Sequence, residues 1–218
     1  MKGTEKINPS RPRYNTTWDP ARVIDHFKTK EQNEDLSLKE LSKKLVTLLA
    51  LATGQRMQTI SLIKLQNICN LGDRIKIYIP DKIKTTRKNA LQPCLDLPFL
   101  NEEPKVCVAS LLEVYIKTTA TLRETDENSL FLTYKKPYKK ATQTTLSRWV
   151  RETLEEARVD PCFKAHSTRH ASTSKALSFG VPLDEILSTA GWSSQNTFSR
   201  FYHRRCVDST FAKSILLS

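Results

Sequence analysis

Side chains that can bind and attack a phosphate ester gather in the last third of the chain. The run 166–169 reads His-Ser-Thr-Arg, Trp192 follows a glycine, and Tyr202 stands ten positions further on. An arginine stays charged, and its planar fork matches two phosphate oxygens. A tyrosine hydroxyl can act as a nucleophile and form a covalent intermediate. These residue types are able to carry out chemistry on a phosphodiester.

Each of these residues also has an ordinary structural interpretation. His166 and His170 lie four positions apart, a spacing that places two metal ligands on one helix face. The zinc-protease pattern needs a glutamate directly after the first histidine, and Ser167 stands there instead. We therefore expect His170 to be a packed or hydrogen-bonded helix residue. Taken alone, Trp192 would be a core residue. Tyr134 and Tyr138, near the candidate edge strand, are expected to be structural.

The composition favours a polyanionic partner. The chain has 35 lysines and arginines against 23 aspartates and glutamates, a net charge of +12. Neutralising phosphates releases their condensed counterions, although a basic or ribosome-associated protein is the alternative. The five cysteines are scattered, which argues against a disulfide framework and a cysteine zinc site. With no signal peptide and no apolar run of roughly 20 residues, a reducing cytosol or the nucleus is expected.

Helix signals dominate the first part of the chain. Residues 1–17 are charged and lack periodicity, so an extended basic arm is expected there. Asp19-Pro20 begins a short helix. Ser37 and Glu40 form a capping box, which predicts a helix that ends at Gly54. A short helix over residues 57–65 should follow at once.

The later segments predict a small sheet followed by more helices. Alternation in IKIYI and CLDLPF predicts antiparallel strands, and LFLTY at 130–134 is a candidate edge strand. Helices are expected at residues 106–123, 143–158, 167–179 and 182–190, around Tyr202, and near the end of the chain. Together these elements predict one α+β domain, mainly α-helical with a small antiparallel β-sheet.

Six residues in order resemble the tyrosine recombinase (phage integrase) family. Thr53-Gly54-Gln55-Arg56 is similar to the family's Thr-Gly-x-Arg, and Lys84 matches its hairpin lysine. The His-x-x-Arg motif, the Gly-Trp motif and Tyr202 follow in the family's order. The N-terminal arm, the GQRMQTISLIKL segment and the SRFYHRR ending are most similar to recombinases of eukaryotic mobile elements, such as DIRS-like retrotransposons and Cryptons. The resemblance implies the family's DNA breaking-rejoining catalytic fold.

The resemblance also implies a role for each matched residue. Arg56 and Arg169 would clamp the phosphate, and Tyr202 would attack it to give a 3′-phosphotyrosyl link and a free 5′-hydroxyl. Lys84 would protonate the leaving oxygen. His166 would transfer a proton or position the phosphate. Trp192 would hydrogen-bond to the phosphate or pack against it. No metal, nucleotide or other cofactor is implied.

The implied function is site-specific DNA strand cleavage and rejoining, as in recombination or integration of a mobile element. A domesticated, non-catalytic DNA-binding protein and a type IB-like topoisomerase are the alternatives. Lys82 is the alternative to Lys84 as the hairpin lysine. Further basic residues are candidates for phosphate contacts, although such runs also occur as solvated loops. The candidate DNA contacts are Lys82, Arg87, Lys88, Lys135, Lys136, Lys139, Lys140, Arg200 and Arg204.

The partners implied are double-stranded DNA and further copies of the chain. Family members act as tetramers on two duplexes, and the amphipathic segment 208–218 could dock on a neighbouring protomer. No membrane partner is expected. The predicted division is an arm over residues 1–17 and a catalytic domain over 18–218, without the family's N-terminal DNA-clamp domain. That clamp would come from another part of a longer polyprotein or be dispensable, and the location would be nuclear, or cytosolic in a prokaryotic host.

Overall fold

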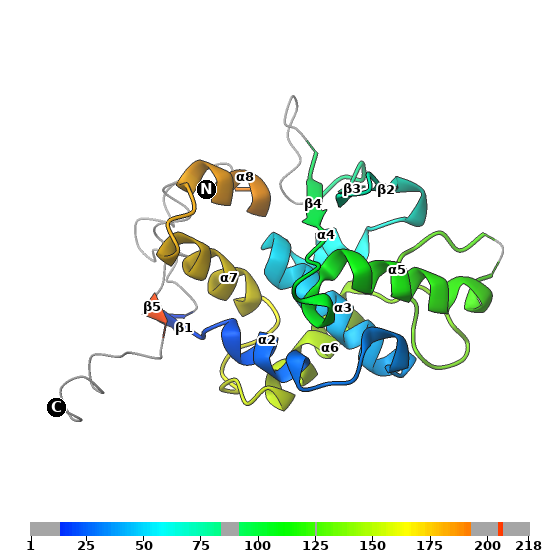
Figure 1. The fold of residues 1–218 in the computed structure, drawn as a ribbon, viewed down its shortest axis with the longest axis horizontal. Coiled ribbons are helices and arrows are strands. Elements are labelled where there is room, and N and C mark those ends of the chain that lie inside the picture. The colour runs from blue at the N-terminus through cyan, green and yellow to red at the C-terminus, as the bar shows by residue number, and fades with distance from the viewer. Residues whose placement is uncertain (1–13, 84–91, 125, 193–204, 207–218) are drawn as a thin grey trace, which may run out of the picture.

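The computed structural model describes residues 14–83, 92–124, 126–192 and 205–206 (Figure 1). The expected helices around Tyr202 and near the end of the chain lie outside these residues. Within them, the fold is mainly α-helical with a small three-stranded antiparallel sheet, as the sequence predicts. None of the helices described is both long and apolar enough to cross a membrane.

Helix α3, Leu38–Thr53, is the centre of the fold and packs against α5, α6 and α7. Ser37 and Glu40 form the predicted capping box at its start. At its end Gly54 adopts the left-handed conformation, with φ of 59°. Both ends of this helix are thus set by local signals that the sequence displays.

The sheet has the strand order β2-β3-β4 and is antiparallel. Strand β3, Arg74–Tyr78, and strand β4, Cys94–Pro98, are the two that alternation predicts. Their inward side chains are buried: Ile75, Ile77, Leu95 and Leu97. The third strand is β2, Ile68–Asn70, which carries no clear alternation in its sequence.

Residues 130–134 do not form the edge strand that we considered. Their backbone groups are satisfied elsewhere: Leu130 donates to the carbonyl of Ile63, and the amide of Leu132 donates to the Tyr115 hydroxyl at 3.1 Å. Phe131 and Leu132 are buried in the core. The apolar character of this segment therefore reflects burial under the helices.

The remaining helices begin and end close to the predicted positions. The exception is the helix expected over residues 57–65, which is split because α4 ends at Ser61 and a 3₁₀ turn follows. The bounds are α2 Ala21–Lys28, α4 Met57–Ser61, α5 Val108–Thr119, α6 Gln143–Glu156, α7 Ser167–Ser178 and α8 Leu183–Ala190. Short 3₁₀ turns are η1 Asn33–Asp35, η2 Leu65–Asn67, η3 Pro104–Val106 and η4 Ala120–Leu122.

The part of the expected arm that the structure describes packs on the domain. Strand β1, Thr16–Thr17, pairs in parallel with β5, Arg205–Cys206. Tyr14, Thr17 and Trp18 are buried. Residues 14–17 therefore belong to the packed domain, and the expected arm over residues 1–13 lies outside the described residues.

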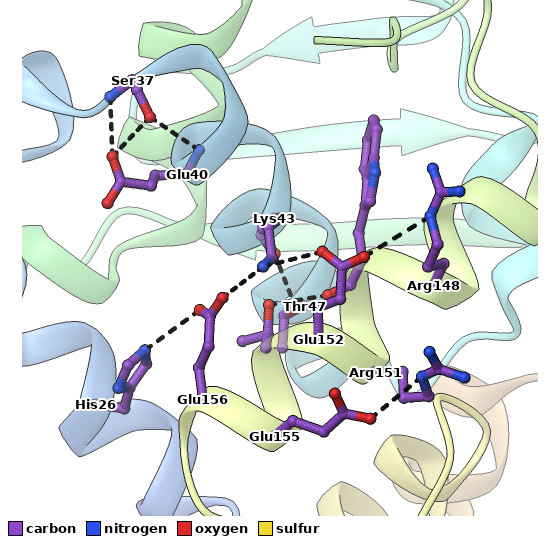
Figure 2. Close-up of polar contacts among 12 residues, drawn as sticks. His26, Ser37, Glu40, Lys43, Thr47, Arg148, Arg151, Glu152, Glu155 and Glu156 are labelled. Carbon is purple, nitrogen blue, oxygen red and sulfur yellow. Dashed lines mark hydrogen bonds and ion pairs between the residues drawn. The ribbon is translucent and has the colours of Figure 1, made fainter.

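A network of charges joins α2, α3 and α6 at the far end of α3 from Gly54 (Figure 2). Lys43 lies between Glu152 and Glu156, with nitrogen–oxygen distances of 3.1 and 2.6 Å. Burial alone would lower the pKa of Lys43, but its bonds to the two carboxylates raise that pKa above its ordinary value. His26 on α2 lies 3.9 Å from Glu156.

Candidate active site

Arg56 is positioned by a sharp turn between α3 and α4. Gly54 in this turn packs closely on α7 and α8, because a Cβ there would lie 3.2 Å from Ala190 Cβ and 3.3 Å from Thr173 Cγ2. The left-handed φ and this close approach both favour glycine over any residue with a Cβ. Arg56 follows as the half-buried N-cap residue of α4.

Arg169 on α7 joins the ends of two other helices. Its guanidinium is almost fully buried, and Nη1 donates to the carbonyl of Gly54, at the end of α3. The same nitrogen donates to the carbonyl of Ala190, at the end of α8, at 2.5 Å. Helix C-termini carry partial negative charge, so they are favourable partners for a buried cation. These bonds fix the position of the guanidinium.

Trp192 lies against Arg169. Helix α8 ends at Gly191, whose left-handed φ of 66° turns the chain. The Trp192 ring then stacks on the guanidinium, 3.9 Å from Arg169 Cζ to the ring centroid. A cation held over an indole face is stabilised by the ring's quadrupole. In the described structure, Trp192 thus buttresses an arginine that we expect to bind phosphate.

His166 precedes the first turn of α7 and is half-buried. Its ring meets His170 edge to face, with 5.5 Å between centroids. His170 is buried and also contacts the Tyr14 ring at 5.4 Å. His170 is therefore a packed helix residue, as expected from the sequence.

A cavity of about 280 Å³ brings three of the six predicted residues together. Arg56, His166 and Arg169 line it, although Arg56 lies more than a hundred positions before the other two in the sequence. Gln143 and Ser147 on α6 also line it, and no sequence motif marked either of them. The full lining is Gln55, Arg56, Met57, Gln58, Gln143, Ser147, Ala165, His166, Thr168 and Arg169.

The other predicted residues are placed as follows. Lys84 and Tyr202 lie outside the described residues, as do Arg87, Lys88, Arg200 and Arg204. Lys82 is exposed shortly after β3. Four further lysines are exposed on the loop before α6: Lys135, Lys136, Lys139 and Lys140. The catalytic and DNA-contact roles of all these residues stay predictions.

Comparison with known proteins identifies the family. The model of the phage integrase family matches residues 22–206, which include the whole cavity. The chain belongs to the phage integrase family. A comparison with curated proteins gave no match.

Solved recombinases share the fold of this phage integrase chain. XerH site-specific recombinase, in a post-cleavage complex with palindromic difH substrate, matches with a TM-score of 0.66 and 17% identity, over 94% of this chain and 54% of that one. XerA recombinase matches with a TM-score of 0.62 and 16% identity, over 98% of this chain and 67% of that one. The Tn1549 transposon integrase in complex with transposon right end DNA matches with a TM-score of 0.60 and 16% identity, over 96% of this chain and 67% of that one. This chain spans about half the length of the XerH chains it matches.

Proposed function

We propose that this chain cleaves and rejoins DNA strands through a 3′-phosphotyrosyl bond to Tyr202, as the catalytic part of a site-specific recombinase. The observation that carries the proposal is the cavity that Arg56, His166 and Arg169 share. The match of the phage integrase family to residues 22–206 supports the same function. The substrate is double-stranded DNA.

The two arginines that line the cavity would both bind the scissile phosphate. Negative charge grows on the non-bridging oxygens as the nucleophile approaches, and fixed guanidiniums stabilise that charge without reorganising. Arg169 is preorganised for this task by its bonds to Gly54 and Ala190 and by its stack on Trp192. Arg56 is less buried and supplies the second guanidinium.

In the proposed step, the oxygen of Tyr202 forms a bond to phosphorus, and the bond from phosphorus to the 5′ oxygen breaks. The tyrosine proton leaves by way of a base, and the departing 5′ oxygen takes up a proton. We assign the proton donor to Lys84 and a proton-transfer or positioning role to His166. The covalent link conserves the energy of the phosphodiester, so a 5′-hydroxyl can later reverse the step.

The same proposal covers assembly and location. The exposed lysines of the loop before α6 are suited to backbone phosphates, which position DNA without specifying its sequence. Four copies would act on two duplexes, with the segment 208–218 docking between protomers. A dimer of lambda integrase bound to a core site and a tetramer bound to a Holliday junction are among the solved structures with this fold. We assign the chain to the nucleus, or to the cytosol of a prokaryotic host.

A nicked suicide substrate tests the proposal. Cleavage beside the nick releases a short fragment and traps the enzyme, which gives a slowly migrating protein–DNA band on a denaturing gel. Wild-type protein is expected to give this band with DNA from the termini of its own element. Tyr202→Phe is expected to give none while its DNA affinity stays nearly unchanged, because only the nucleophilic oxygen is lost.

Two other outcomes would replace the proposal. DNA binding without a covalent band, even with the upstream region supplied, would identify a non-catalytic DNA-binding protein. Relaxation of supercoiled DNA without recombinant products would identify a topoisomerase.

A further inference from the structure

The segment before α2 is bonded to the motif that carries His166 and Arg169. Trp18 Nε1 donates to Ser167 Oγ at 2.8 Å, across 149 positions of sequence. Trp18 is 3% exposed and Ser167 is fully buried. This hydrogen bond therefore lies inside the protein, where water does not compete for its donor or its acceptor.

Further contacts hold the same segment along the whole of α7. The hydroxyl of Tyr14 accepts from the amide of Lys164 at 3.3 Å, just before the helix. The Tyr14 ring packs edge-on against His170, whose ring in turn meets His166. Asp19 forms an ion pair with Lys175 in the last turn, at 2.6 Å. The segment thus contacts the start, the middle and the end of α7.

Backbone hydrogen bonds hold the first turn of α7: Ser167 N donates to the Lys164 carbonyl at 2.7 Å, and Thr168 N donates to the Ala165 carbonyl at 3.3 Å. His166 occupies the N-cap position, yet no capping hydrogen bond from its side chain is found among the described residues. An N-cap side chain usually sets where a helix begins and how its first turn is oriented. The bond from Trp18 to Ser167 Oγ is not a cap, because it satisfies no backbone N–H group of the helix. It ties the first turn of α7 to the segment before α2, directly between His166 and Arg169 in the sequence.

The same segment continues into the pairing of β1 with β5. Thr16 pairs with Arg205 and Thr17 with Cys206, and Arg205 is three positions after Tyr202. Figure 1 shows β1 and β5 side by side near one end of α7. One short segment therefore contacts the cavity's histidine–arginine motif and also the chain just beyond the proposed nucleophile.

We propose that Trp18 is a positioning residue for DNA cleavage, acting through Ser167 to hold His166 and Arg169 at the phosphate cavity. This inference rests on the proposed function. Trp18 does not line the cavity and does not touch the reacting atoms. Its effect is on the geometry of the first turn of α7, and a small displacement of catalytic groups is enough to slow a reaction strongly.

The test removes the hydrogen bond and keeps the packing. Trp18→Phe retains a buried aromatic ring but has no N–H group, and Ser167→Ala removes the acceptor. Trp149→Phe is the matched control, because Trp149 is equally buried and its Nε1 has no hydrogen-bond partner in the described structure. Each variant is assayed for single-turnover cleavage of the suicide substrate at saturating protein, for DNA affinity and for melting temperature.

We expect Trp18→Phe and Ser167→Ala each to slow single-turnover cleavage about tenfold relative to Trp149→Phe. DNA affinity should match that of the control, and each variant should stay folded at the assay temperature, although loss of the buried hydrogen bond should lower the melting temperature by roughly 2–4 °C. The double variant should cleave no more slowly than either single one. A Trp18→Phe rate equal to wild type would overturn the inference, and so would an equal loss in Trp149→Phe. If Trp18→Phe failed to fold, Ser167→Ala would decide alone. Absence of cleavage by wild type would instead refute the proposed function, and this inference with it.

Discussion

Lys44 gives the stability of this protein a pH dependence that can be calculated from the structure. Its side chain is 1% exposed, its Nζ donates to Asn33 Oδ1 at 2.8 Å, and the nitrogen lies 5.7 Å from the centroid of the Phe27 ring. Burial, and secondarily the charge of Lys105, lower the pKa of Lys44 from 10.5 to about 8. No carboxylate is bonded to the ammonium in the described structure.

The lowered pKa of Lys44 means that the unfolded chain holds its proton more tightly than the folded one. Between about pH 8 and the unfolded pKa, the unfolded state binds more protons, so the free energy of unfolding rises with pH. The full difference corresponds to about 3 kcal/mol. From about pH 7.5 to about pH 9.5, this linkage is expected to add about 2 kcal/mol to the free energy of unfolding.

The measurement is urea unfolding of wild type and Lys44→Met at these two pH values. Other groups that titrate in the window, such as Cys94, whose pKa is raised by burial, are present in both proteins and cancel in the comparison. The packing of methionine also cancels, because only the change with pH is compared. Lys39→Met, at an exposed position of the same helix, should keep the wild-type slope. Parallel pH dependences in wild type and Lys44→Met would refute the reasoning.

Two further predictions concern the site. Arg169→Lys keeps the charge but loses the planar guanidinium, whose Nη1 donates to Gly54 and Ala190 and whose plane stacks on Trp192. Unfolding free energy should therefore fall by about 2 kcal/mol, and single-turnover cleavage should slow by about a hundredfold or more. Exposed Arg151→Lys should change neither, and an unimpaired Arg169→Lys enzyme would contradict the assigned role. Gly54→Ala should lower unfolding free energy by about 2 kcal/mol, because a left-handed φ and two close contacts combine. Gly180→Ala is the control, because Gly180 has a φ of 80° and open space around it, so only the backbone cost of about 1 kcal/mol is expected. Equal losses of unfolding free energy in the two variants would count against the packing argument.

Elements that are specified locally could be predicted from the sequence. The capping box at Ser37 and the stop at Gly54 depend on neighbouring residues, and alternation over five residues in β3 is a local signal. Strand β2 has only three residues, so its identity as a strand comes from its pairing with β3. The pairing of β1 with β5 joins segments from opposite ends of the chain, and two residues in each carry no pattern.

In the candidate site, too, the residues that stand in short sequence motifs could be predicted and the others could not. Arg56, His166 and Arg169 were predicted because each stands in a short motif, and they line one cavity. Gln143 and Ser147 reach that cavity from α6, where they resemble any polar residues on an amphipathic helix. The bond between Trp18 and Ser167 could not be predicted either, because neither residue reveals a partner 149 positions away.

The separate sequence motifs act in the structure as one unit, and this explains why glycines belong to them. Gly54 and Gly191 both take the left-handed conformation, one at the end of α3 and the other at the end of α8. A helix that ends in this way leaves its last carbonyls without partners inside the helix. Arg169 Nη1 donates hydrogen bonds to the carbonyl oxygens of Gly54 and Ala190 and so supplies a partner at both helix ends. The charge that we expect to bind phosphate is therefore also the group that joins α3, α7 and α8, so a substitution at Arg169 should change stability and catalysis together.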